Sequence, residues 1–106
     1  MKLSIITVAY NAAGTIAETI ESVLGQKNVD IEYIIIDGAS TDGTSEIVNK
    51  YKDRIAQFVS EKDQGIYDAM NKGIKLATGH IIGLLNADDL YAYPTFLHEV
   101  QQTFLD

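Results

Sequence analysis

The segment HIIGLLNADD, residues 80–89, is an apolar run that ends in two adjacent carboxylates. Residues 81–85 have the composition of a core strand, which would place Asp88 and Asp89 at its carboxyl end. Two carboxylates this close together are costly to keep charged unless a cation neutralises them. Mg²⁺ or Mn²⁺ is the simplest partner, because a hard divalent cation binds oxygen ligands and leaves positions for further ones. The segment therefore predicts a metal site at the end of a strand.

The rest of the chain alternates between strand-like and helix-like segments. Strands are predicted at residues 3–9, 31–36, 55–60 and 80–85. The second and fourth are continuous Ile and Leu runs, which is typical of strands buried on both faces. Such alternation predicts an α/β domain with right-handed crossovers and an open, mostly parallel sheet covered by helices on both faces.

Four helices are predicted between and after these strands. The first should begin with a capping box of Thr15 and Glu18 and end at Gly25, and the third should follow Gly65 and end at Gly79. The fourth should begin at Pro94. The apolar stripes of the four helices are Ile16, Ile20, Val23 and Leu24; Ile47, Val48 and Tyr51; Ile66, Met70 and Ile74; and Phe96, Leu97, Val100 and Phe104.

Composition limits the domain organisation and the function classes. With 106 residues and 46% hydrophobic content, residues 1–106 are expected to form a single domain. The net charge of −7 opposes binding to nucleic acid. The absence of cysteine excludes disulfides and thiolate chemistry and suits a reducing compartment, and the amino-terminal apolar stretch is shorter than a membrane span. We therefore expect a cytoplasmic protein.

In open parallel sheets, ligands bind outside the carboxyl ends of the strands, where the strand order reverses. A strand order of 3-2-1-4 would bring Tyr10, Asp37 and the pair Asp88 and Asp89 around one crevice. Tyr10 offers a flat ring on which a base can stack, or it is an ordinary tyrosine at the rim. Asp37 can accept a hydrogen bond from uracil or guanine, or it holds the turn that follows it. Asp42 is expected to cap the second helix.

Electrostatics connects the acidic crevice to a metal. At an effective dielectric constant of about 20, a carboxylate and a phosphate charge about 5 Å apart repel each other by about 3 kcal/mol. An acidic crevice would therefore reject a diphosphate unless a divalent cation lies between them. We predict that Asp89 is the metal ligand. Asp88 is predicted to accept a hydrogen bond from a ribose hydroxyl and also to approach the metal. The alternative is a solvated turn that leads into the fourth helix.

Four blocks of this sequence resemble the amino-terminal half of family 2 glycosyltransferases, which have a GT-A fold. They are TVAYNA at residues 7–12, IIDGASTDGT at 35–44, DQGIYDAMNKG at 63–73 and ATGHIIGLLNADD at 77–89. Their order and spacing make the resemblance specific, and it covers nearly the whole chain. The third block is similar to bacterial members that build polysaccharides.

The resemblance implies a Rossmann-like nucleotide-binding half that takes part in inverting transfer from a UDP- or GDP-sugar to a carbohydrate or lipid-linked acceptor. It implies that Thr7 and Ala9 line the nucleotide pocket, with Tyr10 and Asp37 at the base. By the same resemblance, Asp88 holds the ribose and Asp89 holds Mn²⁺ or Mg²⁺.

One departure concerns the metal motif, which is usually Asp-x-Asp in the family, whereas Asn86 stands here at its first position. The family also places its acceptor-binding half and general base beyond residue 106. We therefore expect a truncated chain that is inactive alone and whose catalytic base is unassigned. Any association with membranes is expected to be peripheral only.

Other functions are weighed against the same residues. A dinucleotide-binding oxidoreductase would carry its glycine-rich fingerprint after the first strand, where this chain has Tyr10 and Asn11. An acidic receiver domain of a signalling system would need its acidic pair at that same place. A module that binds a nucleotide sugar without turning it over stays open as an alternative.

Overall fold

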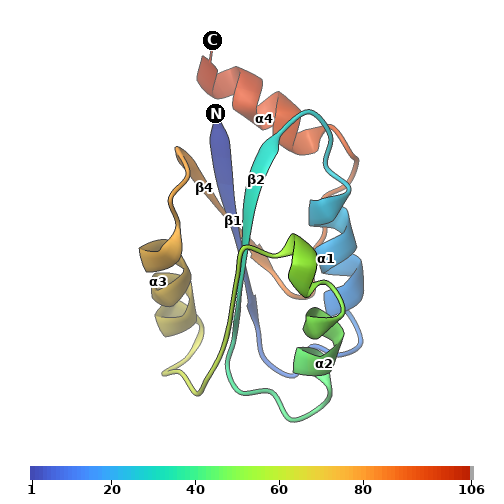
Figure 1. The fold of residues 1–106 in the computed structure, drawn as a ribbon, viewed down its shortest axis with the longest axis vertical. Helices are drawn as coiled ribbons and strands as arrows, with labels where there is room; N and C mark the ends of the chain where they lie inside the picture. The colour runs from blue at the N-terminus through green and yellow to red at the C-terminus, as the bar shows by residue number, and fades with distance from the viewer. Residues whose placement is uncertain (106) are drawn as a thin grey trace.

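The computed structural model describes residues 1–105 and contains one sheet with helices on both of its faces (Figure 1). The strands are β1 (Lys2–Ala9), β2 (Asp30–Asp37), β3 (Gln57–Ser60) and β4 (Ile81–Asn86). The helices are α1 (Ile16–Leu24), α2 (Thr44–Asn49), α3 (Ile66–Leu76) and α4 (Phe96–Leu105), with a short 3₁₀ helix, η1, at Lys52–Arg54. None of the helices within residues 1–105 has the length and apolar character needed to cross a lipid bilayer.

The predicted sheet topology is confirmed. The strand order is β3-β2-β1-β4 and every pair of neighbours is parallel. In the register, Ala9 lies beside Asp37, Asp37 beside Ser60, and Val8 beside Asn86. Because the strands are parallel, the loops that follow all four of them open at one edge of the sheet.

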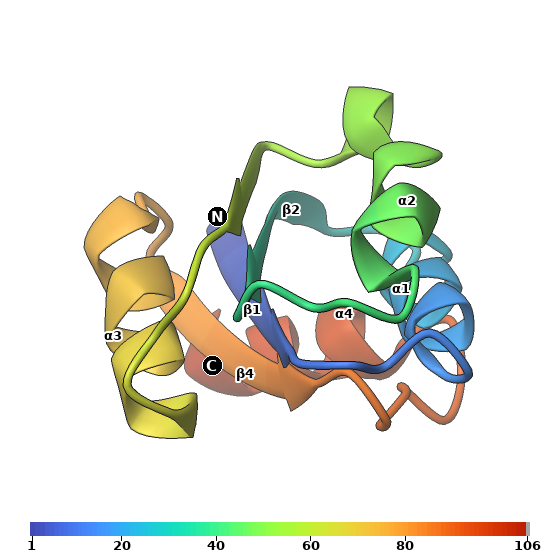
Figure 2. The same cartoon turned by 90° about the horizontal axis from the view of Figure 1, so that it is seen from below.

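Two separate cores hold the helices to the sheet. On one face, residues such as Ile5 and Ile35 pack against α1, α2 and α4, and on the other face Ile6 and Ile34 pack against α3. Figure 2 shows α3 alone on its side of the sheet and the other three helices on the opposite side. Burial of both faces of β1 and of the carboxyl-terminal part of β2 gives the sheet a rigid centre on which the loops are mounted.

Of the apolar stripe predicted on α3, only Met70 packs against the core. Ile66 and Ile74 are 47% and 41% exposed, whereas Ala69 and Gly73 are buried against the sheet. A Cβ at Gly73 would lie 2.5 Å from Ile6 Cγ2, which is too close for any side chain. The helix therefore approaches β1 through its smallest residues, and Ile66 and Ile74 stay largely exposed.

The prediction that both faces of β4 are buried is also wrong. Ile82 and Leu84 are 44% and 47% exposed. In this chain β4 is an edge strand, and α3 packs over β1 and β2 instead of over β4. Phe104, predicted on the buried stripe of α4, is likewise exposed, whereas Leu97 of the same stripe is buried.

Two predicted helix signals have other roles. Thr15 is the residue before α1, but its side chain makes no capping bond and instead donates to the backbone oxygen of Ala87 at 2.8 Å. Helix α3 ends at Leu76, before Gly79. A Cβ at Gly79 would lie 2.8 Å from the backbone nitrogen of Ser4, so glycine is needed there for close packing on β1.

Candidate functional site

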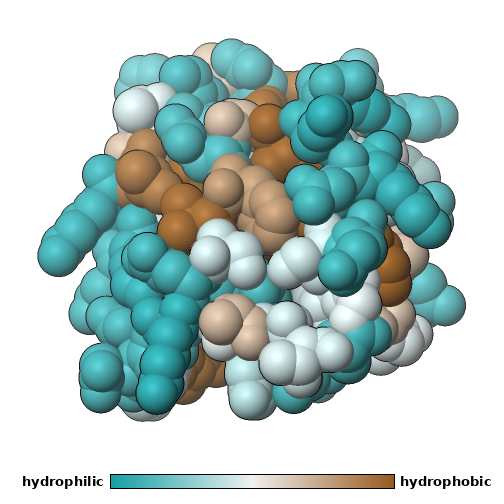
Figure 3. Space-filling model, turned by 60° about the horizontal axis from the view of Figure 1, so that its bottom comes forward, coloured by the Kyte–Doolittle hydropathy of each residue, from teal (hydrophilic) through white to brown (hydrophobic). Residues whose placement is uncertain are grey.

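A cleft of about 860 Å³ opens at the carboxyl ends of the strands. Its walls come from all four loops that follow the strands, together with the first residues of α3. Figure 3 looks toward this end of the molecule and shows apolar side chains gathered between polar margins. The lining residues are Val8 to Ala12, Thr15, Gly38, Ala39, Lys62, Asp63, Gly65, Ile66, Ala69 and Asn86 to Asp88.

Tyr10 and Ala9 line the cleft at the end of β1. Tyr10 is 67% exposed, and a Cβ at Gly38 would lie 3.4 Å from its ring. Ala9 is buried, and its backbone oxygen accepts a hydrogen bond from the nitrogen of Gly38 at 2.9 Å. An exposed ring beside a bare glycine backbone offers a surface on which a planar group can stack.

Hydrogen bonds tie the loop after β1 to the loop after β2. Asn11 has a positive φ of 48°; its nitrogen donates to Ser40 Oγ at 2.8 Å and its Oδ1 accepts from the nitrogen of Thr41 at 2.9 Å. Such a conformation is tolerated by asparagine better than by most residues. The two loops therefore form one connected wall.

Asp42 supports the same wall, but the residue that caps α2 is Gly43 and not, as predicted, Asp42. Its Oδ1 accepts from the nitrogen and the hydroxyl of Thr44, at 3.1 and 2.6 Å, and its Oδ2 accepts from the nitrogen of Ala13 at 3.1 Å. The bond from the Thr44 hydroxyl, followed by that from Ala13, lowers the pKa of Asp42 below its ordinary value.

Asp37 lies beneath the cleft and does not line it. Its side chain is completely buried, in agreement with the turn-holding alternative left open by the sequence. It accepts hydrogen bonds from three serine hydroxyls, Ser40 at 2.5 Å, Ser60 at 2.8 Å and Ser45 at 3.3 Å, and from the backbone nitrogen of Ser40 at 2.9 Å. Both of its oxygens are thereby occupied within the protein.

Thr7 is also buried and is not a lining residue, although the resemblance implied that it would be. Its hydroxyl lies 2.8 Å from the hydroxyl of Tyr33 on β2. Burial raises the pKa of Tyr33, so this pair stays neutral. The side chain of Thr7 points into the core between the sheet and α1, because it lies on the same face of β1 as Leu3, Ile5 and Ala9.

The loop after β4 is held by helix α1. The hydroxyls of Thr15 and Thr19 donate to the backbone oxygen of Ala87, at 2.8 and 3.0 Å. Asp88 is exposed and lines the cleft. Asp89 is exposed next to it, but its carboxylate is not part of the lining.

The donor set at this loop fits a hard divalent cation with few protein ligands. Within residues 1–105, no three His, Cys, Asp or Glu side chains are gathered closely enough to hold a metal ion. Asn86 and Asp88 line the cleft with an amide and a carboxylate, the oxygen donors that Mg²⁺ and Mn²⁺ prefer. The remaining ligands would have to come from Asp89, water and a bound diphosphate.

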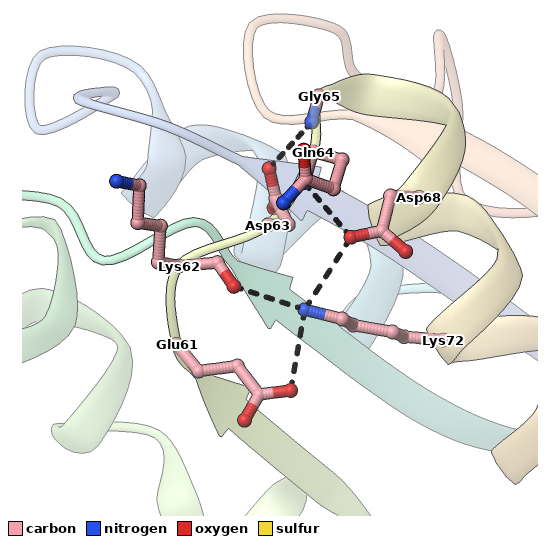
Figure 4. Close-up of polar contacts among 7 residues, drawn as sticks. All are labelled: Glu61, Lys62, Asp63, Gln64, Gly65, Asp68 and Lys72. Carbon is pink, nitrogen blue, oxygen red and sulfur yellow. Dashed lines mark hydrogen bonds and ion pairs between the residues drawn. The ribbon is translucent and has the colours of Figure 1, made fainter.

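The loop between β3 and α3 supplies a wall of the cleft, although no site residue was predicted in it. Lys62, Asp63, Gly65 and Ile66 all line the cleft. The signal was present, because the block beginning DQG at residue 63 directly follows a predicted strand. Asp63 Oδ1 accepts from the nitrogen of Gly65 at 3.0 Å, which shapes the turn (Figure 4).

Lys72 fixes this loop from below (Figure 4). Its ammonium lies 3.2 Å from Glu61, 3.7 Å from Asp68 and 3.3 Å from the backbone oxygen of Lys62. Although desolvation acts in the opposite direction, the Glu61 carboxylate and the other acidic groups raise the pKa of Lys72. Lys72 is therefore paired within the protein, while Lys62 is the lysine that reaches the cleft.

Comparison with known proteins assigns the family. The model of glycosyl transferase family 2 matches residues 4–106. This chain belongs to glycosyl transferase family 2. A curated member, the UDP-Glc:alpha-D-GlcNAc-diphosphoundecaprenol beta-1,3-glucosyltransferase WfaP of Escherichia coli, is 43% identical over 90 residues, covering 84% of this chain and 36% of that protein.

Solved structures show that this family 2 domain has the GT-A fold. The mannosyltransferase PcManGT from Pyrobaculum calidifontis, in complex with GDP-Man and Mn²⁺, matches with a TM-score of 0.89 and 28% identity over 98% of this chain and 32% of its own. TarS residues 1–349 of S. aureus, in complex with UDP-GlcNAc, match with a TM-score of 0.83 and 26% identity over 100% of this chain and 31% of that one. The chain thus spans about a third of the length of the relatives it matches.

Proposed function

We propose that the cleft binds a nucleoside-diphosphate sugar together with Mn²⁺ or Mg²⁺, as part of an inverting transfer to an acceptor hydroxyl. The observation that carries the proposal is the convergence of an exposed aromatic ring, Tyr10, and a carboxylate, Asp88, on one cleft of about 860 Å³. Ligand clefts are commonly about 300 to 1,000 Å³ and mostly apolar, with a few polar groups that orient the ligand. The GDP-Man and UDP-GlcNAc complexes of similar proteins support this ligand class.

In this proposal each lining residue has a physical task. The base stacks on Tyr10 beside Gly38, and Ala9 leaves room at the end of β1. Asp88 accepts a hydrogen bond from the ribose and, with Asp89, holds the divalent cation. The Asp89 carboxylate would have to rotate toward the cleft, which its exposed position permits.

The cation supplies stabilisation of the negative charge that develops on the leaving diphosphate. Lys62 adds one positive charge at the same cleft. The protein's own part is positioning, since Thr15 and Thr19 fix the carbonyl of Ala87 and so fix the place of Asp88. The proposal includes a cytoplasmic location and assigns no general base.

Calorimetric titration of the chain with UDP and GDP tests this function. We expect binding in the presence of Mn²⁺ or Mg²⁺ and a marked loss of affinity in excess chelator. Asp88→Asn should reduce the difference between the two conditions, because it removes a charged ligand of the cation. Equal affinity with and without metal would remove the metal from the proposal, and a folded chain that binds neither nucleotide would contradict the function itself.

A further inference from the structure

Gly38 lies between the ring of Tyr10 and the carboxylate of Asp63. A Cβ at position 38 would be 2.9 Å from Asp63 Oδ2 and 3.4 Å from Tyr10 Cδ1. Both side chains therefore reach the same point above the bare backbone of Gly38, and all three residues line the cleft. A planar ring stacked on Tyr10 at this point would have one edge toward Asp63.

The two oxygens of Asp63 are in different situations. Oδ1 accepts the hydrogen bond from the nitrogen of Gly65 at 3.0 Å and so belongs to the turn (Figure 4). Oδ2, the atom nearest to Gly38, accepts no hydrogen bond from any other residue of the described chain, 1–105. A half-buried carboxylate oxygen in a cleft is an acceptor that a ligand N–H can satisfy.

Asp37, for which the family resemblance implied this role, is differently placed. It is completely buried, and both of its oxygens already accept hydrogen bonds from serine residues. Asp88 lines the cleft too, but it belongs to the loop after β4, whereas Gly38 belongs to the loop after β2. Asp63 is thus the carboxylate that lies nearest to the ring of Tyr10 above Gly38.

We propose that Asp63 is the residue that selects the base of the nucleotide, an inference that rests on the proposed function. An ionised carboxylate only accepts hydrogen bonds. Uracil and guanine present a ring N–H on their pairing edge, at N3 and N1, whereas cytosine and adenine present an unprotonated ring nitrogen there. Asp63 Oδ2 can therefore accept a hydrogen bond from uracil or guanine. With cytosine or adenine, Oδ2 would face an unprotonated ring nitrogen, which is also an acceptor, so these bases bind less well.

The absence of a side chain at Gly38 contributes to this base selection. Because a Cβ at this position would collide with Asp63 Oδ2, any larger residue would push the carboxylate away from the base. The exchange of Asp63 for asparagine is the sharpest test, since its amide oxygen can still accept from Gly65 while its NH₂ replaces the acceptor Oδ2 with a donor.

The experiment measures the dissociation constants of UDP, GDP, CDP and ADP in Mn²⁺ for the wild-type chain, Asp63→Asn and Asp53→Asn. Asp53→Asn is the matched control, the same exchange at an exposed residue of η1 that does not line the cleft. We expect the wild type to prefer UDP or GDP over CDP and ADP, and Asp63→Asn to narrow that ratio of dissociation constants about tenfold or more. Asp53→Asn should keep the wild-type ratio.

A second measurement does not depend on the variant folding. The wild-type chain should bind N3-methyl-UDP or N1-methyl-GDP at least about tenfold more weakly than the unmethylated nucleotide it prefers, because the methyl group replaces the N–H. An unchanged base preference in folded Asp63→Asn, or equal binding of the methylated nucleotide, would overturn this inference and leave the proposed function intact. Failure of the folded wild type to bind any of the four nucleotides would overturn both.

Discussion

The hydroxyl of Thr19, in the middle of α1, lies 2.6 Å from the backbone oxygen of Asp89 and 3.0 Å from that of Ala87. Thr19 is buried, so its hydroxyl reaches these two carbonyls from inside the protein. A residue 70 positions earlier in the chain thus holds the loop that carries the acidic pair. Helix α1 therefore helps to fix the positions of the two carboxylates, together with strand β4.

Replacement of Thr19 by valine keeps the shape of the side chain and removes the hydroxyl. We expect it to lower the free energy of unfolding by about 1 to 3 kcal/mol, because the carbonyl of Asp89 loses its donor, whereas that of Ala87 keeps the hydroxyl of Thr15. Metal-dependent UDP affinity should fall as well. Thr103→Val is the control, since that exposed hydroxyl on α4 bonds only within its own helix. Denaturant unfolding checks the stability, and a Thr19→Val protein as stable as Thr103→Val would contradict the anchoring role.

A methyl group added at Gly73 is expected to destabilise the protein. In most helix interiors, glycine to alanine stabilises by up to about 1 kcal/mol. Here the new Cβ would lie 2.5 Å from Ile6 Cγ2, so α3 would have to move off the sheet, at a cost of about 1 to 3 kcal/mol. Asn71→Ala, at an exposed position of the same helix, should be neutral or stabilising. Equal melting temperatures for the two variants would show that α3 tolerates the displacement.

The α3 result shows what periodicity could and could not predict. Ile66, Met70 and Ile74 correctly indicated a helix, because their spacing follows the helical repeat. They did not indicate which face is buried, since close packing on Ile6 is decided by the absence of a side chain at Gly73. The alternation of elements, by contrast, was enough to predict that the strands are parallel, which follows from general rules of chain connection; the order 3-2-1-4 was an added assumption that the structure confirms.

Glu32 gives a pH-dependent contribution to stability. It accepts hydrogen bonds from the nitrogen and hydroxyl of Thr78, at 2.8 and 2.7 Å, and from the hydroxyl of Ser4 at 2.8 Å. Those bonds, from Thr78 first, lower its pKa below the ordinary 4.5. A lowered folded-state pKa means that the ionised group stabilises the protein above its unfolded pKa, and that this stabilisation is lost as the pH falls through the folded pKa.

We therefore expect wild type to lose more stability than Glu32→Gln between pH 5 and about pH 3. Unfolding free energies at several pH values in this window check the difference. Above about pH 6 the difference between their free energies of unfolding should be constant. Parallel stability curves through the acidic range would show that Glu32 does not contribute this dependence.

Tyr10→Ala should weaken nucleotide binding with little change in stability. Base stacking on an aromatic side chain is worth about 1 to 3 kcal/mol, which corresponds to a loss of affinity of about tenfold or more. Because Tyr10 is 67% exposed, its ring contributes little to packing. Tyr67→Ala is the matched control, as this tyrosine is more exposed and does not line the cleft. A large drop in melting temperature for Tyr10→Ala would instead favour the packing role of a rim tyrosine.

For the site, the sequence located the loops better than the individual side chains. Tyr10, Ala9 and Asp88 do line one cleft, because parallel strands bring their carboxyl ends to the same edge. Asp37 was left between two roles, and only the positions of the serine residues around it show that it is buried and occupied. Asp63 was not assigned, because its approach to Gly38 joins two loops whose contact no local pattern records.

The location of the nucleotide is tested most directly by mapping chemical-shift changes on ¹⁵N-labelled protein during titration with UDP or GDP in Mg²⁺. We expect the chemical-shift changes to be concentrated in residues 8–12, 38–39, 62–66 and 86–89, with α4 and η1 unaffected. Changes centred elsewhere, or spread evenly over the surface, would contradict a nucleotide site at the carboxyl ends of the strands.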